Sequence, residues 1–159
     1  LPVGWLGKTH ALNEGSKVAD GEWLLFTDAD IHYSRCTLKK AMAFVLKENL
    51  DFLAVSPQLH APGFFLHATL AQFFHQGSLS LDVKKIADPR LDYAIGIGAF
   101  NFIRRSRLEA LGGFKEIRLD VIDDGALAYF AKKTGGRCGF LSGLSEVFVE
   151  WYPGLRALV

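Results

Sequence analysis

Residues 22–30 have the sequence Glu-Trp-Leu-Leu-Phe-Thr-Asp-Ala-Asp, an apolar run that ends in two acidic residues. The run predicts a short buried strand, and Asp28 and Asp30 follow it directly. Ligands of an open α/β sheet collect beyond the carboxyl ends of its strands. Two carboxylates at that place can share Mg²⁺ or Mn²⁺, which prefer oxygen ligands and keep coordination sites open for phosphate oxygens. We therefore predict a metal or phosphate site here, with a simple Asx turn as the structural alternative.

Strands and helices alternate along the rest of the chain. Apolar runs predict strands at residues 22–27, 52–56, 98–104 and 145–151. Helical spacing and helix boundary residues predict helices at residues 9–18, 36–49, 63–81, 106–112 and 123–135. This alternation predicts an α/β fold with a mainly parallel sheet.

The predicted helix at residues 63–81 is rich in phenylalanine, with Phe64, Phe65, Phe73 and Phe74. We interpret it as a helix packed against the sheet, because most aromatic stripes at helical spacing belong to a core. A surface that faces lipid or an apolar acceptor is the alternative.

The bulk composition is that of one globular domain. The chain has 159 residues, half of them hydrophobic, and its formal net charge is +1. This balance gives no general field that would attract nucleic acid. Cys36 and Cys138 form no metal-binding motif, so we expect a reduced, cytosolic pair. No apolar run reaches the roughly 18 residues that a membrane-spanning helix needs.

The two ends of the sequence predict a partial domain. The chain begins at Leu1, has Met42 as its one methionine, and ends at Val159 within an apolar segment. We therefore expect residues 1–159 to be part of a catalytic domain that is truncated at both ends. Membrane helices could belong to the parent protein.

Three further groups of polar residues are candidates for the same site. Asp123-Asp124 opens a predicted helix, where one acid can cap the helix while its neighbour points into the site. Gly7-Lys8 precedes the first helix and offers backbone N–H groups and an ammonium to an anion. His32 is either a further metal ligand or, more simply, a hydrogen-bonding neighbour of the acids.

Four stretches together resemble the family 2 glycosyltransferases of the GT-A fold. They are residues 2–15 (PVGWLGKTHALNEG), 21–30 (GEWLLFTDAD), 96–114 (GIGAFNFIRRSRLEALGGF) and 121–128 (VIDDGALA). They occur in the family's order and are most similar to its bacterial branch that includes hopanoid- and carotenoid-associated transferases. The resemblance implies a Rossmann-like, mainly parallel sheet with helices on both faces, and a nucleotide-sugar donor, for which we expect a UDP-sugar.

The resemblance also implies roles for single residues. Asp28 and Asp30 match the D-x-D motif that holds Mg²⁺ or Mn²⁺, and Asp124 matches the base that accepts the proton of the acceptor hydroxyl in an inverting transfer. The residues implied near the donor nucleotide are Gly7, Lys8 and Asn13. Those implied at the sugar and acceptor pocket are Gly98, Phe100, Asn101, Asp123 and Trp151.

Two family features are missing from the sequence. These are the amino-terminal strand with its nucleotide-binding Asp, and the later Q/R-x-x-R-W motif, near whose place residues 151–156 read WYPGLR. For the parent protein we expect a lipid acceptor and a place at the cytoplasmic face of a membrane.

Two alternatives to the glycosyltransferase remain open. One is a haloacid-dehalogenase-type phosphohydrolase, with Asp28 as nucleophile and Asp30 as acid/base. The other is a non-catalytic fragment that keeps the fold but lacks half of the donor site.

Overall fold

A computed structural model describes residues 1–79, 81–150 and 152, and in it a four-stranded sheet forms the centre. The strand order is β1 (Trp23–Phe26), β5 (Asn101–Arg104), β3 (Phe52–Ser56) and β6 (Cys138–Ser142). β5 is antiparallel to both of its neighbours, whereas β3 and β6 pair in parallel. The strands β1, β3 and β6 therefore run in one direction, and β5 runs against them. The sequence did not predict β6.

The faces of this sheet are separated by the alternation of side chains along β3. Phe52 and Ala54 point into one hydrophobic cluster, and Leu53 and Val55 point into another. All four side chains are buried because a helical layer covers each face.

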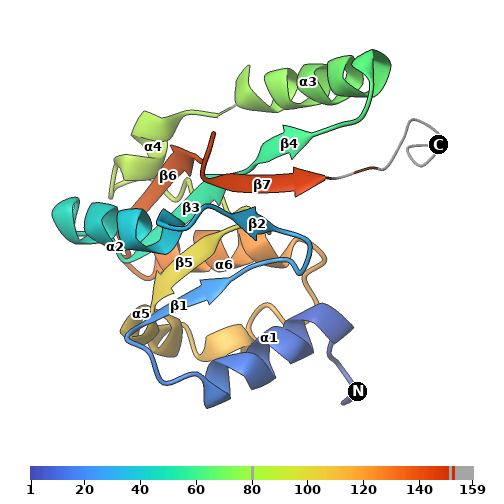
Figure 1. Cartoon of the computed structure of the whole chain (residues 1–159). Helices are drawn as coiled ribbons and strands as arrows, with labels where there is room; N and C mark the ends of the chain where they lie inside the picture. The colour runs from blue at the N-terminus through green and yellow to red at the C-terminus, as the bar shows by residue number, and fades with distance from the viewer. Residues whose placement is uncertain (80, 151, 153–159) are drawn as a thin grey trace.

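The two helical layers have different compositions. α2 (Thr37–Lys47) covers the Leu53 face with Ala41 and Val45. The Phe52 face packs against α4 (Val83–Ala87), α5 (Arg105–Ala110), η1 (Gly113–Lys115) and α6 (Asp123–Lys133). α1 (Gly7–Val18) lies against η1 on the same side (Figure 1). The predicted arrangement of helices on both faces is confirmed.

A second, three-stranded sheet stands beside the first. Its order is β2 (His32–Tyr33), β7 (Val147–Glu150) and β4 (Gln58–His60). β7 pairs antiparallel with β2 and parallel with β4. β7 therefore joins β2, which follows Asp30, to β4, which follows β3.

The phenylalanine-rich helix does not pack where the sequence suggests. α3 (Phe64–Leu79) lies beside β4, away from the four-stranded sheet (Figure 1). Leu66 and Leu70 are buried, but Phe64 and Phe65 are 79% and 75% exposed. The prediction that these two phenylalanines belong to the core is wrong, because the Leu66–Leu70 side of the helix faces the protein instead. The side chains of Phe73 and Phe74 lie outside the described part of the structure.

Candidate active site

The loop after β1 meets the loop before β5, because the two strands are antiparallel neighbours. The backbone N–H of Asp28 donates to the carbonyl of Gly98 at 2.8 Å. A Cβ atom on residue 98 would lie only 2.3 Å from Asp28 Oδ2. Glycine at this position therefore leaves the space that the Asp28 carboxylate occupies.

Lys8 joins acidic residues from two different segments. Its Nζ lies 2.9 Å from Asp28 Oδ1 and 3.1 Å from Asp123 Oδ1. The side chains of Lys8 and Asp28 are 49% and 42% exposed, whereas that of Asp123 is 9% exposed. One ammonium thus compensates a half-exposed carboxylate and a buried one.

The pKa values of Lys8 and Asp123 are both raised, for different reasons. Burial acts to lower the pKa of Lys8, but hydrogen bonds from its ammonium to Asp28 and Asp123 outweigh it and raise that pKa above its ordinary value. Burial raises the pKa of Asp123, and the Lys8 ammonium offsets only part of that effect. Lys8 is therefore a fixed positive charge at neutral pH.

Asp124 lies beside Asp123 in the first turn of α6 and takes a different direction. It lines a cavity of about 300 Å³ together with Asp28 and Asp30. Its Oδ1 accepts a hydrogen bond from the N–H of Gly125 at 2.7 Å. Three carboxylates that are up to 96 positions apart in the sequence thus face one space. The expectation that one acid of the pair caps the helix is wrong, because Ile122 is the N-cap residue of α6 and no side chain caps it. Asp123 pairs with Lys8 instead, and its neighbour Asp124 lines the cavity.

Gly96 is a site residue to which sequence reasoning assigned no role. A Cβ atom at this position would lie 1.8 Å from the backbone oxygen of Asp124. The loop 96–98 therefore touches the Asp124 segment at one glycine and the Asp28 side chain at the other. The Gly-x-Gly pattern at residues 96–98, three positions before β5, is the signal that could have indicated such a close approach.

Two other predicted residues, Phe100 and Asn101, are packed in the interior of the protein. Phe100 and Asn101 are 1% and 2% exposed, which places both in the interior rather than on a pocket wall. Phe100 packs edge-on against Tyr33, and Asn101 Oδ1 accepts from the N–H of Ile97 at 3.0 Å. The predicted strand at residues 98–104 is shorter, since β5 begins at Asn101. These two buried residues hold the loop 96–98 in place.

The remaining predicted residues are dispersed. Gly7 begins α1, one position before Lys8. Asn13 is buried further along α1, donates to Glu14, and faces a separate cavity beside η1. His32 is exposed on β2, opposite Phe148. Trp151 lies outside the described residues.

The carboxylate oxygens that line the cavity are the type of ligand that a hard cation requires. Within the described ranges, no group of three or more His, Cys, Asp or Glu side chains converges as a complete metal site. Mg²⁺, however, is commonly held by one or two carboxylates plus substrate phosphates, so a complete protein cage is not needed. Asp28 and Asp30 fit that kind of site.

The sequence model of the glycosyl transferase family 2 matches residues 1–112. The chain belongs to this family. The match includes Lys8, Asp28, Asp30 and the loop 96–98, and it ends before Asp123 and Asp124. No curated protein sequence matches the chain significantly.

Solved structures similar to this family 2 chain include TarS and a mannosyltransferase. Staphylococcus aureus TarS is 20% identical, with a TM-score of 0.58, over 87% of this chain and 23% of TarS. TarS 1–349 in complex with UDP-GlcNAc is 19% identical, with a TM-score of 0.57, over 89% and 38%. The mannosyltransferase PcManGT from Pyrobaculum calidifontis, in complex with GDP-Man and Mn²⁺, is 27% identical, with a TM-score of 0.57, over 84% and 34%.

These similarities confirm the predicted GT-A fold. The chain spans well under half the length of each of these structures. Across the part of the chain that the structure describes, no helix is long and apolar enough to cross a membrane.

Proposed function

We propose that this chain transfers a glycosyl group, with inversion, from a nucleoside-diphosphate sugar to an acceptor hydroxyl. The observation that carries the proposal is the shared cavity of Asp28, Asp30 and Asp124 in a chain of glycosyltransferase family 2. Such a reaction forms a bond between the acceptor oxygen and the anomeric carbon and breaks the bond from that carbon to the diphosphate. The acceptor proton needs a base, and the leaving diphosphate needs positive charge.

The donor side of the proposal rests on Asp28, Asp30 and Lys8. Asp28 and Asp30 would hold Mg²⁺ or Mn²⁺, which offsets the charge on a leaving diphosphate when it is bound. Lys8 and the backbone N–H groups at the start of α1, near Gly7, would supply further positive potential for the same anion. We assign Asn13 a supporting role in this helix. A UDP-sugar is the expected donor, in line with the UDP-GlcNAc complex of TarS.

The acceptor side rests on Asp124 as the general base. It lines the cavity and is not engaged by Lys8, whose partners are Asp28 and Asp123. Asp123 holds Lys8 in place, and Gly98 forms part of the cavity wall. Phe100 and Asn101 fix the loop that carries Gly98. For Trp151 we keep a role in acceptor binding as a proposal from the family resemblance.

The branch of the family and the cellular location of the parent protein are also proposals. We place the chain in the bacterial branch that includes hopanoid- and carotenoid-associated transferases, as a partial catalytic domain of a parent protein at the cytoplasmic face of a membrane. An amphiphilic lipid would then be available as the acceptor.

The phosphohydrolase alternative is disfavoured by the sheet. A D-x-D nucleophile of that class follows a strand in a parallel sheet, whereas β1 pairs antiparallel with β5. Release of inorganic phosphate from p-nitrophenyl phosphate would favour this alternative. Calorimetric titration with UDP and Mn²⁺ addresses the non-catalytic fragment: binding to the full-length protein but not to residues 1–159 would support it.

Two substitutions in the full-length protein test the proposed roles. Asp124→Asn should lower turnover by roughly 10²–10⁴-fold, the usual contribution of a general base, and leave donor binding intact. Asp30→Ala should weaken Mn²⁺-dependent donor binding. Transfer from radiolabelled UDP-sugars and calorimetry with UDP and Mn²⁺ measure the two effects. Normal turnover by Asp124→Asn would show that the base is another residue.

A further inference from the structure

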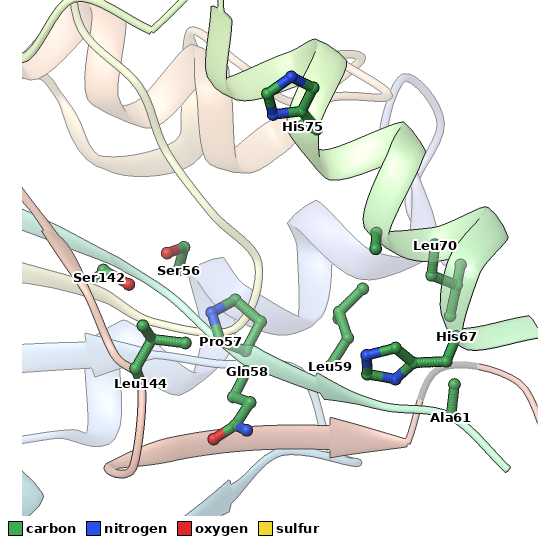
Figure 2. Close-up of a pocket in the computed structure, with 11 residues that line it drawn as sticks. Ser56, Pro57, Gln58, Leu59, Ala61, His67, Leu70, His75, Ser142 and Leu144 are labelled. Atoms are coloured by element: carbon green, nitrogen blue, oxygen red, sulfur yellow. The ribbon is translucent and has the colours of Figure 1, made fainter. Parts of the chain in front are cut away.

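A second cavity adjoins the acidic one. Figure 2 shows the residues that line this second cavity. It has a volume of about 440 Å³ and lies between α3, β4 and the connection from β6 to β7. Pro57 and Leu59 line both cavities. This size is within the range of roughly 300–1,000 Å³ that is typical of small-molecule sites. The two spaces therefore form adjacent chambers with a common wall.

The second chamber differs from the first in charge. Three Asp side chains line the first chamber. Among the described residues that line the second chamber there is no Asp, Glu, Lys or Arg. The whole sequence from residue 52 to residue 81 also lacks these four residue types. A phosphate group would meet no Lys or Arg among the described residues of the second chamber, so a neutral ligand is favoured there.

The lining residues of the second chamber are suited to an amphiphile. Leu59, Leu70 and Leu144 supply apolar surface, and Ser56, Gln58 and His67 supply hydrogen-bonding groups. Figure 2 shows the His67 side chain extending from α3 towards Leu59 of β4. α3 begins with the exposed side chains of Phe64 and Phe65, one turn before His67.

We propose that the second chamber binds the acceptor and that this acceptor is a neutral amphiphile, an apolar chain or ring system that presents a hydroxyl group. Its apolar part lies between α3 and β4, and its hydroxyl passes Pro57 and Leu59 to reach Asp124. The proposal rests on the proposed function, since it names the acceptor class for the same reaction. It also explains why α3 lies outside the core of the sheet: the helix forms one wall of the acceptor site.

The test compares two alanines on the exposed surface of α3. Ala71 lines the second chamber, whereas Ala68 does not. In Ala71→Trp the indole ring fills the chamber, and Ala68→Trp adds the same ring to the same helix outside it. Calorimetry of the full-length protein with 1-monodecanoylglycerol, below its aggregation concentration, measures the affinity of both variants and the wild type. Decyl phosphate is the charged counterpart of this probe.

We expect the wild type and Ala68→Trp to bind 1-monodecanoylglycerol alike, and Ala71→Trp to bind it at least about tenfold more weakly, which corresponds to about 1.4 kcal/mol. Decyl phosphate should bind more weakly than 1-monodecanoylglycerol. The inference is overturned if the wild type does not bind the glycerolipid, if Ala71→Trp binds it as the wild type does, or if decyl phosphate binds equally well.

A parallel titration with UDP and Mn²⁺ separates this inference from the proposed function. Both tryptophan variants should bind UDP and Mn²⁺ with wild-type affinity, because neither residue lines the acidic cavity. A wild-type protein that binds the glycerolipid but does not bind UDP would contradict the proposed function and still support the neutral binding site.

Discussion

Lys8 is the residue on which the charge balance of the candidate site depends. Its ammonium contacts Asp28, one of the two carboxylates proposed to hold a cation. A divalent cation at Asp28 and the Lys8 ammonium therefore compete for the same carboxylate. When a diphosphate enters, it offers Lys8 a new partner, so nucleotide and cation should each strengthen the binding of the other.

The substitution Lys8→Gln tests this competition. Without nucleotide, the variant should bind Mn²⁺ several-fold more tightly than the wild type, because Asp28 loses its competing cation. With UDP present, the complex should be weaker by roughly 10- to 100-fold, the loss of one charge-assisted hydrogen bond of about 1.5–3 kcal/mol. Mn²⁺ paramagnetic resonance measures both constants. Lys17→Gln is the control, since Lys17 lies on the same helix and pairs with Glu14; equal behaviour of the two variants would contradict the competition.

The two cysteines should differ in reactivity. Cys36 is exposed, whereas Cys138 is buried and burial raises its pKa to about 12. The thiolate is the reactive form, so Cys138 has almost none of it at pH 8 and gains it only as the pH approaches 12. Iodoacetamide at pH 8 should label Cys36 alone in the native protein, and both cysteines in guanidinium chloride. Mass spectrometry counts the adducts, and two adducts on the native protein would be inconsistent with this burial.

At the scale of elements, the loop 96–98 positions the acids of two distant segments. Gly98→Ala should displace the Asp28 carboxylate, because the new Cβ would lie 2.3 Å from Oδ2. The end of a side chain can move, so we expect a folded protein with turnover lowered by at least about tenfold, as misplacement of a catalytic group produces.

Gly96→Ala should have a larger structural effect. Its Cβ would lie 1.8 Å from the backbone oxygen of Asp124, and backbone yields less easily than a side chain. We expect a loss of about 1–3 kcal/mol of stability as well as of turnover. Gly15→Ala is the control, since its Cβ would meet no atom within 4 Å apart from its chain neighbours and the backbone of its own helix, and Ala favours the helix. Urea denaturation and activity assays distinguish the three variants; a Gly96→Ala protein as stable as the wild type would disprove the close contact.

The elements themselves were predictable to different degrees. β3 spans the predicted residues 52–56, and α6 begins at Asp123 as predicted, because an apolar run and an acidic helix start are local signals. The place of α3 was not predictable. Its phenylalanines satisfy helical spacing in either location, and only the burial of Leu66 and Leu70 decides which side faces the protein.

At the scale of the whole molecule, β3 couples the two hydrophobic clusters. Phe52 and Leu53 are adjacent, fully buried and directed into opposite clusters. Phe52→Ala and Leu53→Ala should each cost about 2–5 kcal/mol, the usual range for such truncations. Both should lower the midpoint of one cooperative transition, because the clusters share a strand. Urea titrations followed by circular dichroism and by tryptophan fluorescence would reveal separate transitions if the clusters unfolded independently.

The sequence by itself determined the family of this chain and the acidic residues that are candidates for its site. Apolar runs, acidic residues and glycines in the order of a glycosyltransferase family 2 domain are local features, and the family match over residues 1–112 confirms the family. Only the tertiary structure decided which acids meet. Lys8 pairs with Asp28 and Asp123 while Asp124 faces the cavity, because β5 lies between β1 and β3 and brings the loop 96–98 against both acidic segments. Such contacts depend on strand order, which no local pattern records.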